Sequence, residues 1–142
     1  MIIYDTDIFS LMQHGEGSHY PKLIARVCGL SREEIKITIV SFEEQTRGWL
    51  GHLSRAKTPE KEIEAYSRLL KLLNQFSEID GLPFDRESSF HFERLRKAKI
   101  RIGTLDMRIA AIAIAHSATL VTRNTRDFEK ITGLKIEDWT KE

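Results

Sequence analysis

The chain has 142 residues, the size of one ordinary domain, and we expect residues 1–142 to form a single domain. Apolar residues make up 41% of the chain and charged residues 30%, which is typical of a soluble protein with a hydrophobic core. No apolar run approaches the roughly 20 residues that a membrane span needs, and no signal peptide is evident. We therefore expect no membrane contact and, by default, a cytoplasmic location. Cys28 is the only cysteine, so an intrachain disulfide is excluded.

The net charge of +1 conceals an asymmetry between the two parts of the chain. Residues 1–85 carry 10 basic and 13 acidic side chains, whereas residues 86–142 carry 12 basic and 8 acidic ones. The basic excess is densest from Arg94 to Arg101, where five of eight residues are cations. Such a segment can dock a polyanion, although on its own it is better explained as a solvated helix end and loop.

Strand-like apolar runs alternate with helical patterns along the chain. The strand-like runs are residues 2–4, 35–40, 79–84, 119–121 and 134–139. The helical patterns cover residues 7–28 (one or two helices, broken near 15–17), 42–54, 58–78, 87–97 and 104–116. This alternation predicts a parallel sheet covered by helices, and right-handed crossovers place the carboxyl ends of its strands on one side.

Two of these helices have clear local signals. Thr58 can cap the first, with Pro59 at its first helical position. Apolar residues then recur at spacings of three and four and mark one stripe: Ile63, Tyr66, Leu69, Leu70, Leu73 and Phe76. In the second helix Thr104 is the expected cap, and one apolar face contains Ile109, Ile112 and Ala113.

Four acidic residues fall where strands end or helices begin: Asp5, Glu44, Asp106 and Asp127. Each has an ordinary explanation, since Asp5 and Asp127 can cap helices, Asp106 can complement a helix dipole and Glu44 can be a solvated first-turn residue. Their joint pattern is more informative, because ligands of parallel α/β sheets bind beyond the carboxyl ends of the strands. Two charges 4 Å apart repel by about 4 kcal/mol at an effective dielectric near 20. A divalent cation removes much of that repulsion and suits phosphodiester hydrolysis.

The segments around these acids resemble the four motifs of the PIN-domain ribonucleases. The opening motif is similar to Ile3-Tyr4-Asp5-Thr6-Asp7, and the second, an acid four residues before a glycine, resembles residues 41–48 and selects Glu44 over Glu43. The third and fourth resemble residues 103–111 and 120–128. The motifs occur in the family's order across nearly the whole chain, and the length is similar to that of the VapC toxin branch.

This resemblance implies a three-layer α/β/α PIN-like fold with a central parallel sheet. It implies a Mg²⁺- or Mn²⁺-dependent endoribonuclease that is the toxin of a toxin–antitoxin pair and cleaves tRNA or another structured RNA. The matching catalytic and metal-holding acids are Asp5, Glu44, Asp106 and Asp127, and the matching supporting polar residues are Thr6, Thr122 and Asn124. The implied partners are the RNA substrate, a VapB-type antitoxin and a second copy of the chain in a homodimer.

Several other residues have less certain roles. Asp7 stands where the family often has asparagine, and it is either a fifth acid near the metal or a helix cap, of which we favour the cap. Five arginines are candidate RNA contacts: Arg47, Arg96, Arg108, Arg123 and Arg126. No histidine lies in a shared motif, and Cys28 has no evident histidine partner, so neither imidazole nor thiol catalysis is favoured.

Two rival functions remain open. Asp5-Thr6-Asp7 after a first strand also resembles the nucleophile motif of haloacid-dehalogenase phosphatases, although Phe9 stands where that family has threonine or valine. The second rival is a PIN-like scaffold without catalytic activity, which the complete set of four acids disfavours.

Overall fold

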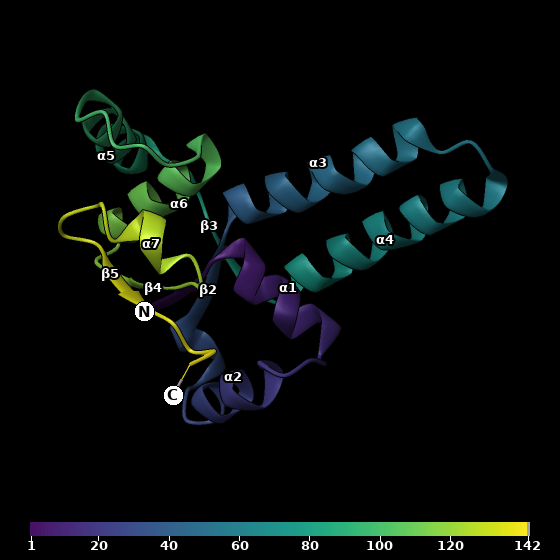
Figure 1. Cartoon of the computed structure of the whole chain (residues 1–142), viewed down its shortest axis with the longest axis horizontal. Coiled ribbons are helices and arrows are strands. Elements are labelled where there is room, and N and C mark those ends of the chain that lie inside the picture. The colour runs from purple at the N-terminus through teal and green to yellow at the C-terminus, as the bar shows by residue number, and fades with distance from the viewer. Residues whose placement is uncertain (142) are drawn as a thin grey trace.

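A computed structural model describes residues 1–141 and contains one parallel sheet of five strands (Figure 1). Its spatial order is β3-β2-β1-β4-β5, and every neighbouring pair is parallel. The strands are β1 (Ile2–Tyr4), β2 (Ile35–Thr38), β3 (Asp80–Leu82), β4 (Thr119–Val121) and β5 (Lys135–Glu137). The longer helices are α1 (Thr6–His14), α2 (Tyr20–Val27), α3 (Ile39–Arg55), α4 (Pro59–Ser77), α5 (Arg86–Lys97) and α6 (Thr104–Ala115). The short helices are η1 (Arg32–Glu34) and α7 (Thr125–Phe128).

Helices cover both faces of the sheet, so the expected three-layer α/β/α architecture is confirmed. On one face, Ile3 and Leu120 pack against the apolar side of α6, where Ile109, Ile112 and Ala113 are completely buried. On the other face, the neighbouring positions Tyr4 and Val121 pack against α1 and α2. Successive residues of a strand point to opposite faces, which is why adjacent residues of β1 and β4 belong to different clusters.

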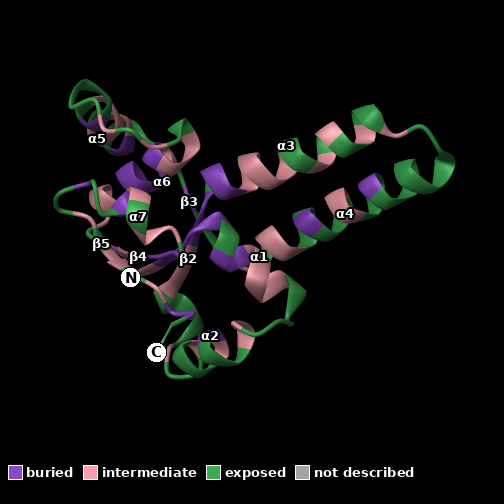
Figure 2. Cartoon of the chain, in the orientation of Figure 1, coloured by how far each residue is buried: buried purple, intermediate pink, exposed green. Residues whose placement is uncertain are grey.

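The antiparallel pair α3 and α4 projects from the body of the molecule (Figure 1). Thr58 caps α4 as expected, because its side chain accepts a hydrogen bond from the Lys61 backbone N–H at 3.2 Å. The apolar stripe of this helix is largely solvent-exposed, and Figure 2 shows the distal part of the pair mostly exposed. The side chains that are 58–65% exposed are Ile63, Tyr66, Leu70 and Leu73. We call these four residues the α4 stripe.

Some element boundaries differ from those expected. Helix α3 begins at Ile39, within the segment expected to be strand, because the Thr38 side chain accepts a hydrogen bond from Ser41 N and caps the helix there. Thr104 was expected to cap α6, but it is the first helical residue, and Gly103 occupies the cap position without a side-chain bond. The segment 7–28 forms two helices, and the first ends at Gly15, which has φ 68°.

Within residues 1–141, no helix combines the length and apolarity that crossing a bilayer requires.

Two leucines of α4 allow a direct test of this packing. Leu72 is 4% exposed, so Leu72→Ala should cost about 2–5 kcal/mol of unfolding free energy. Leu70 is 60% exposed, so Leu70→Ser should change it by less than about 0.5 kcal/mol. Urea denaturation of both variants measures the difference, and a large loss in Leu70→Ser would contradict the exposed position of the stripe.

Candidate active site

The candidate site lies at the carboxyl ends of β1 and β4, where the strand order reverses direction. Strand β1 lies between β2 and β4, so the chain continues outward from β1 to one side of the sheet and later to the other. Parallel α/β proteins bind ligands at such a switch point. Tyr4 pairs in register with Val121, so the next residues, Asp5 and Thr122, are neighbours. The backbone N–H of Asp5 also donates to the Val121 carbonyl oxygen at 2.9 Å, which fixes the position of Asp5.

Asp5 is the most buried of the four candidate acids, at 5% exposure. One carboxylate oxygen accepts a hydrogen bond from the Thr6 backbone N–H at 2.9 Å, so Asp5 caps α1. The other accepts from the Thr122 hydroxyl at 2.8 Å, and that hydroxyl in turn accepts from the Asn124 backbone N–H at 3.0 Å. The Asp5 side chain is therefore both the cap of α1 and a candidate metal ligand. Its orientation is set by two hydrogen-bond donors, Thr6 N and the Thr122 hydroxyl, from different parts of the chain.

A second set of buried hydrogen bonds joins α1 to α3. The hydroxyls of Thr6 and Ser41 are 2.8 Å apart, and Ser41 N donates to the Thr38 hydroxyl at 3.2 Å. Thr38 and Ser41 are completely buried. This link fixes the start of α3, which carries Glu44, against the start of α1, which carries Asp5. Sequence reasoning gave Ser41 no role, and its side-chain partner, Thr6, is 35 residues away in the chain.

Glu44 and Asp106 approach Asp5 from two further helices. Burial raises the pKa of Asp5 to about 6, against the opposing Thr122 hydrogen bond, and the charges of Asp106 and Glu44 raise it further. Burial also raises the pKa of Asp106, which lies in the first turn of α6, with added contributions from the charges of Glu44 and Asp127. The structure thus brings all four candidate acids into one electrostatically coupled group, which we call the carboxylate cluster.

Asp127 is the outer member of the carboxylate cluster and differs from the others in its surroundings. The Asn124 side-chain amide donates to it at 3.1 Å, and the Lys130 ammonium lies 3.4 Å from its other oxygen. The hydrogen bond from Asn124 is the main cause of the lowered pKa of Asp127. The hydrogen bond and charge of Lys130 lower this pKa further. Sequence reasoning did not select Lys130, although its position three residues after Asp127 on a helical turn favours such contact.

The cluster fits a hard divalent cation in its chemistry. Carboxylate oxygens are the ligands that Mg²⁺ and Mn²⁺ prefer. The Glu44 Oε1 atom is buried and has no hydrogen-bond partner within residues 1–141, so a cation would satisfy it. In the same part of the chain, no three acidic, histidine or cysteine side chains already converge closely enough to hold one ion. Binding therefore requires side-chain adjustment around Asp5, whose orientation is the most constrained.

Asp7 does not cap a helix, so the favoured expectation for it was wrong. Asp5 is the cap of α1, and Asp7 lies in the first turn, where the Arg123 guanidinium donates to both of its carboxylate oxygens at 2.7 and 2.9 Å. The pair is partly exposed, and the hydrogen bond from Arg123 raises the pKa of the guanidinium. The position that is often asparagine in the family therefore carries the charge that pairs with Arg123.

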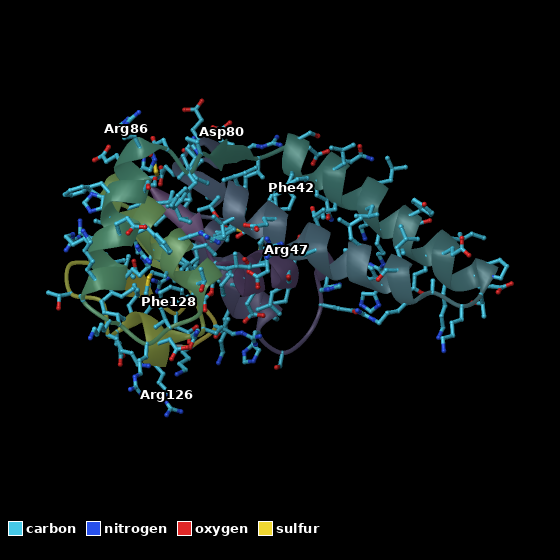
Figure 3. All side chains as sticks on the ribbon, turned by 90° about the horizontal axis from the view of Figure 1, so that it is seen from above. Phe42, Arg47, Asp80, Arg86, Arg126 and Phe128 are labelled. Atoms are coloured by element: carbon cyan, nitrogen blue, oxygen red, sulfur yellow. The ribbon has the colours of Figure 1, made fainter. Side chains whose placement is uncertain are left out.

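The other candidate RNA-contacting arginines lie around the helices that surround the cluster. Arg47 pairs with Glu43 at 2.6 Å on α3, and Arg96 pairs with Glu93 on α5. The Arg108 guanidinium lies 5.2 Å from the centre of the Phe92 ring. Arg126 extends outward from α7, whereas Phe128 of the same helix points into the core (Figure 3).

Comparison with known proteins identifies the family. The family model described as "PIN domain" matches residues 2–134, and the chain therefore belongs to the PIN-domain family. Ribonuclease VapC1 of Haemophilus influenzae strain R2866 is 27% identical over 127 residues, which are 85% of this chain and 87% of that protein. The tRNA(fMet)-specific endonuclease VapC of Shigella flexneri is 37% identical over 68 residues, covering 45% of this chain and 52% of that protein.

A solved structure extends this likeness to the whole fold. The structure of VapBC2 from Rickettsia felis, bound to a DNA fragment from the promoter, has a TM-score of 0.69 and 27% identity, covering 98% of this chain and 99% of that one. Some curated relatives align over about half of their own length, including the Shigella flexneri protein. These comparisons confirm the expectation of a VapC-type PIN-domain protein. Membership of this family disfavours the alternative of a haloacid-dehalogenase phosphatase.

The burial of Asp106, together with the charges of Glu44 and Asp127, should reduce the stability of the metal-free protein. Asp106 has a raised folded-state pKa, so its destabilising effect is absent below the unfolded value of 3.8 and complete above the raised value. Asp106→Asn should therefore raise the melting temperature in EDTA at pH 7.5, and the gain should shrink towards pH 4. Differential scanning calorimetry measures this change.

Asp80→Asn is the matched control for that experiment. The pKa of Asp80 is lowered by its hydrogen bond and ion pair with Lys36, so the same substitution there should leave the melting temperature unchanged or slightly lower. A lower melting temperature for Asp106→Asn in EDTA would contradict electrostatic coupling in the cluster.

Proposed function

We propose that the protein is a metal-dependent endoribonuclease and the toxin component of a toxin–antitoxin pair. The observation that carries this proposal is the coupling of Asp5, Glu44, Asp106 and Asp127 at one edge of the sheet. The names of the relatives support it, because those proteins are called ribonuclease VapC1 and tRNA(fMet)-specific endonuclease VapC. A cytoplasmic location is part of the same proposal.

In the proposed reaction, the four carboxylates hold one or two Mg²⁺ or Mn²⁺ ions. A bound ion supplies activation of water near neutral pH and stabilisation of the charge that develops on the phosphate. Asp5, fixed by Thr6 N and Thr122, positions the inner side of this site, and Glu44 provides an otherwise unsatisfied oxygen. The 3′ oxygen leaves, which gives products with a 5′-phosphate and a 3′-hydroxyl.

The proposed substrate is tRNA or another structured RNA. The name of the Shigella flexneri relative supports tRNA as the first substrate to test, since that protein is called a tRNA(fMet)-specific endonuclease. Cations near the cluster support an anionic substrate, and Arg47 and Arg108 line one hollow beside α3 with Phe84. Contacts of this kind position a phosphate backbone without selecting a sequence.

We further propose a VapB-type antitoxin and a second copy of the chain as partners. A toxin–antitoxin complex from Klebsiella pneumoniae is among the structures with this fold, at a TM-score of 0.69 and 18% identity. The α4 stripe supports a protein partner, because four large apolar side chains on one exposed helix face are the usual anchor of a helix or strand from another chain. We assign this stripe to the antitoxin.

Cleavage of RNA tests the proposed activity. Purified protein should cut total tRNA into discrete fragments in Mg²⁺ or Mn²⁺ and not in EDTA. Asp5→Asn should lower the rate roughly 100-fold or more, because it removes charge from the most constrained carboxylate. Labelled-RNA gel electrophoresis measures both effects, and circular dichroism checks the fold.

Asp7→Asn is the control for Asp5→Asn, at a position two residues later in the chain. Asp7 pairs with Arg123 instead of the cluster, so this variant should cleave within a few-fold of the unchanged protein. Full activity in Asp5→Asn would refute the site. Absence of cleavage of any tRNA or ribosomal RNA by folded, antitoxin-free protein would favour the scaffold alternative.

Co-purification tests the proposed partners. With its antitoxin co-expressed, tagged protein should recover a complex, and Leu70→Ser should reduce recovery at least tenfold because it replaces an anchor of the α4 stripe by a polar group. Light scattering of the antitoxin-free chain should give the mass of a homodimer. Ser67→Ala, at an exposed position of α4 outside the stripe, is the control. Equal recovery of the complex by both variants would show that the antitoxin does not bind the α4 stripe.

A further inference from the structure

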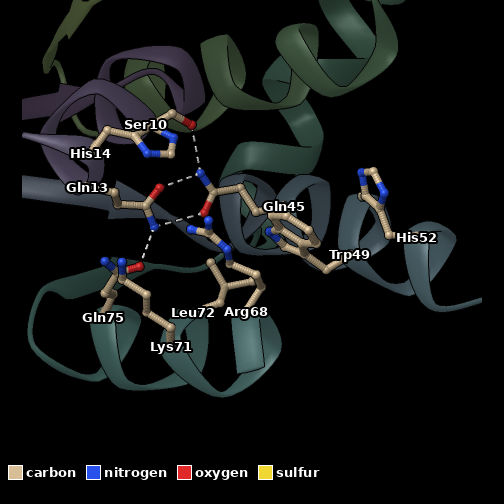
Figure 4. Close-up of a pocket in the computed structure, with 11 residues that line it drawn as sticks. Ser10, Gln13, His14, Gln45, Trp49, His52, Arg68, Lys71, Leu72 and Gln75 are labelled. Atoms are coloured by element: carbon tan, nitrogen blue, oxygen red, sulfur yellow. Dashed lines mark hydrogen bonds between the residues drawn. The ribbon is translucent and has the colours of Figure 1, made fainter. Parts of the chain in front are cut away.

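A polar cleft lies between α1, α3 and α4, on the opposite side of α4 from the α4 stripe (Figure 4). Its volume is about 250 Å³. The α4 residues that line it are Arg68, Lys71, Leu72 and Gln75, which recur at spacings of one, three and four residues and so share one helix face. The stripe residues Leu70 and Leu73 come two positions after the lining residues Arg68 and Lys71. Two positions correspond to a rotation of about 200° around the helix, so the stripe and the cleft lie on opposite faces of α4.

The cleft carries positive charge that nothing in the described chain neutralises. Its lining includes Arg68 and Lys71 but no carboxylate. Within residues 1–141, neither cation forms an ion pair with an acidic side chain. The Arg68 guanidinium lies 5.5 Å from the centre of the Trp49 ring, a contact that holds the cation at the wall without cancelling its charge. The cleft is therefore suited to an anion.

Three glutamine side chains form a connected hydrogen-bond network in this cleft (Figure 4). The Gln45 amide donates to Gln13 at 2.8 Å and to the Ser10 hydroxyl at 2.9 Å. The Gln13 amide donates to Gln45 at 3.2 Å and to Gln75 at 2.7 Å. Both amide donors of Gln13 and Gln45 are used within the network, so the groups left to bond the edge of a nucleobase are the Gln75 amide N–H groups and the remaining carbonyl lone pairs.

The cleft and the carboxylate cluster share helix α3, which carries Glu44 as well as Gln45, Gly48 and Trp49 of the cleft lining. Gln45 follows Glu44 directly, and Gly48 lies one turn after Glu44 on the same side of the helix, about 6 Å further along its axis. Gly48 lines the cleft, and a Cβ atom placed on it would meet no atom within 4 Å. A glycine inside a helix costs about 1 kcal/mol relative to alanine, and neither packing nor backbone conformation requires one here. Its effect is to leave open space beside α3 at the wall of the cleft.

We propose that this cleft binds a nucleotide of the RNA that flanks the cleaved bond. Arg68 and Lys71 contact its phosphate, and the Gln13–Gln45–Gln75 network contacts the edge of its base. This inference rests on the proposed ribonuclease function and assigns part of the substrate to a site outside the carboxylate cluster. A polar, cationic lining favours RNA over the apolar segment of a protein partner, for which the α4 stripe is the better surface.

Metal-free binding tests the phosphate contact without cleavage. The probe is a fluorescein-labelled single-stranded RNA dodecamer of mixed sequence, measured by anisotropy in EDTA at several salt concentrations. Lys71→Gln should weaken binding about three- to tenfold and lower the slope of log affinity against log salt by about 0.7, the value for one phosphate contact to a single strand. Lys135→Gln, an equal charge change at the start of β5, should alter neither quantity.

A second variant separates steric blockage from misfolding. Gly48→Leu replaces a helix-interior glycine with a good helix former in open space, so its melting temperature should equal or exceed that of the unchanged protein. Its affinity for the RNA dodecamer should nevertheless fall at least fivefold, because the leucine side chain projects from the wall of the cleft into its open space. Unchanged affinity in this stable variant would overturn the proposal.

The remaining outcomes separate this proposal from the proposed function. If the unchanged protein cleaves tRNA and Lys71→Gln does so with the same KM, the cleft proposal fails while the nuclease proposal stands. If the protein binds the dodecamer through Lys71 but never cleaves RNA, the nuclease proposal and the placement beside a cleaved bond both fail, while RNA binding in the cleft stands. Loss of antitoxin binding in Lys71→Gln with unchanged RNA affinity would assign the cleft to the protein partner and overturn the RNA proposal.

Discussion

The burial of carboxylates that also repel one another at one sheet edge is the constraint on which the rest of the site depends. Burial alone would favour a neutral Asp5, and its neighbours Asp106 and Glu44 raise its pKa further. The fold opposes this tendency by fixing Asp5 with donors from Thr6 and Thr122, which stabilise the ionised form. The arrangement is one that a cation would relieve, and it exists because three crossover connections bring distant segments to the same edge.

The polar anchors of the site are as buried as the hydrophobic core. Thr38, Ser41 and Thr122 are completely buried, and each has a hydrogen-bond partner. Buried hydroxyls without partners would destabilise the fold, so these contacts permit only a narrow range of positions for α1 and α3. The precision of the site therefore comes from satisfied polar groups beneath the carboxylates, more than from the carboxylates themselves.

Much of this could be predicted from sequence, and the failures have identifiable physical causes. Each of the five strands lies within a segment that apolar runs had indicated, since strand burial is a local pattern. The start of α3 was misplaced because Ile39 and Val40 are apolar in either structure, and the Thr38 cap decides between them. The role of Asp7 was misjudged because its partner Arg123 is 116 residues away, and the glutamine network joins residues from three helices for the same reason.

The α3–α4 pair shows why periodicity alone did not reveal function. The regular stripe Ile63, Tyr66, Leu70 and Leu73 reads as a core-facing surface, yet it is exposed, while Leu72 is buried. The apolar stripe of α4 is exposed and the opposite face of the same helix lines the polar cleft, so one helix presents two surfaces of different chemistry. Gly48, on α3, belongs to the wall of this cleft, where a residue that weakens the helix is retained without any local packing need. On the proposed RNA binding, access to the cleft explains this glycine more directly than stability does, because Gly48 lines the cleft and a side chain there would enter its open space.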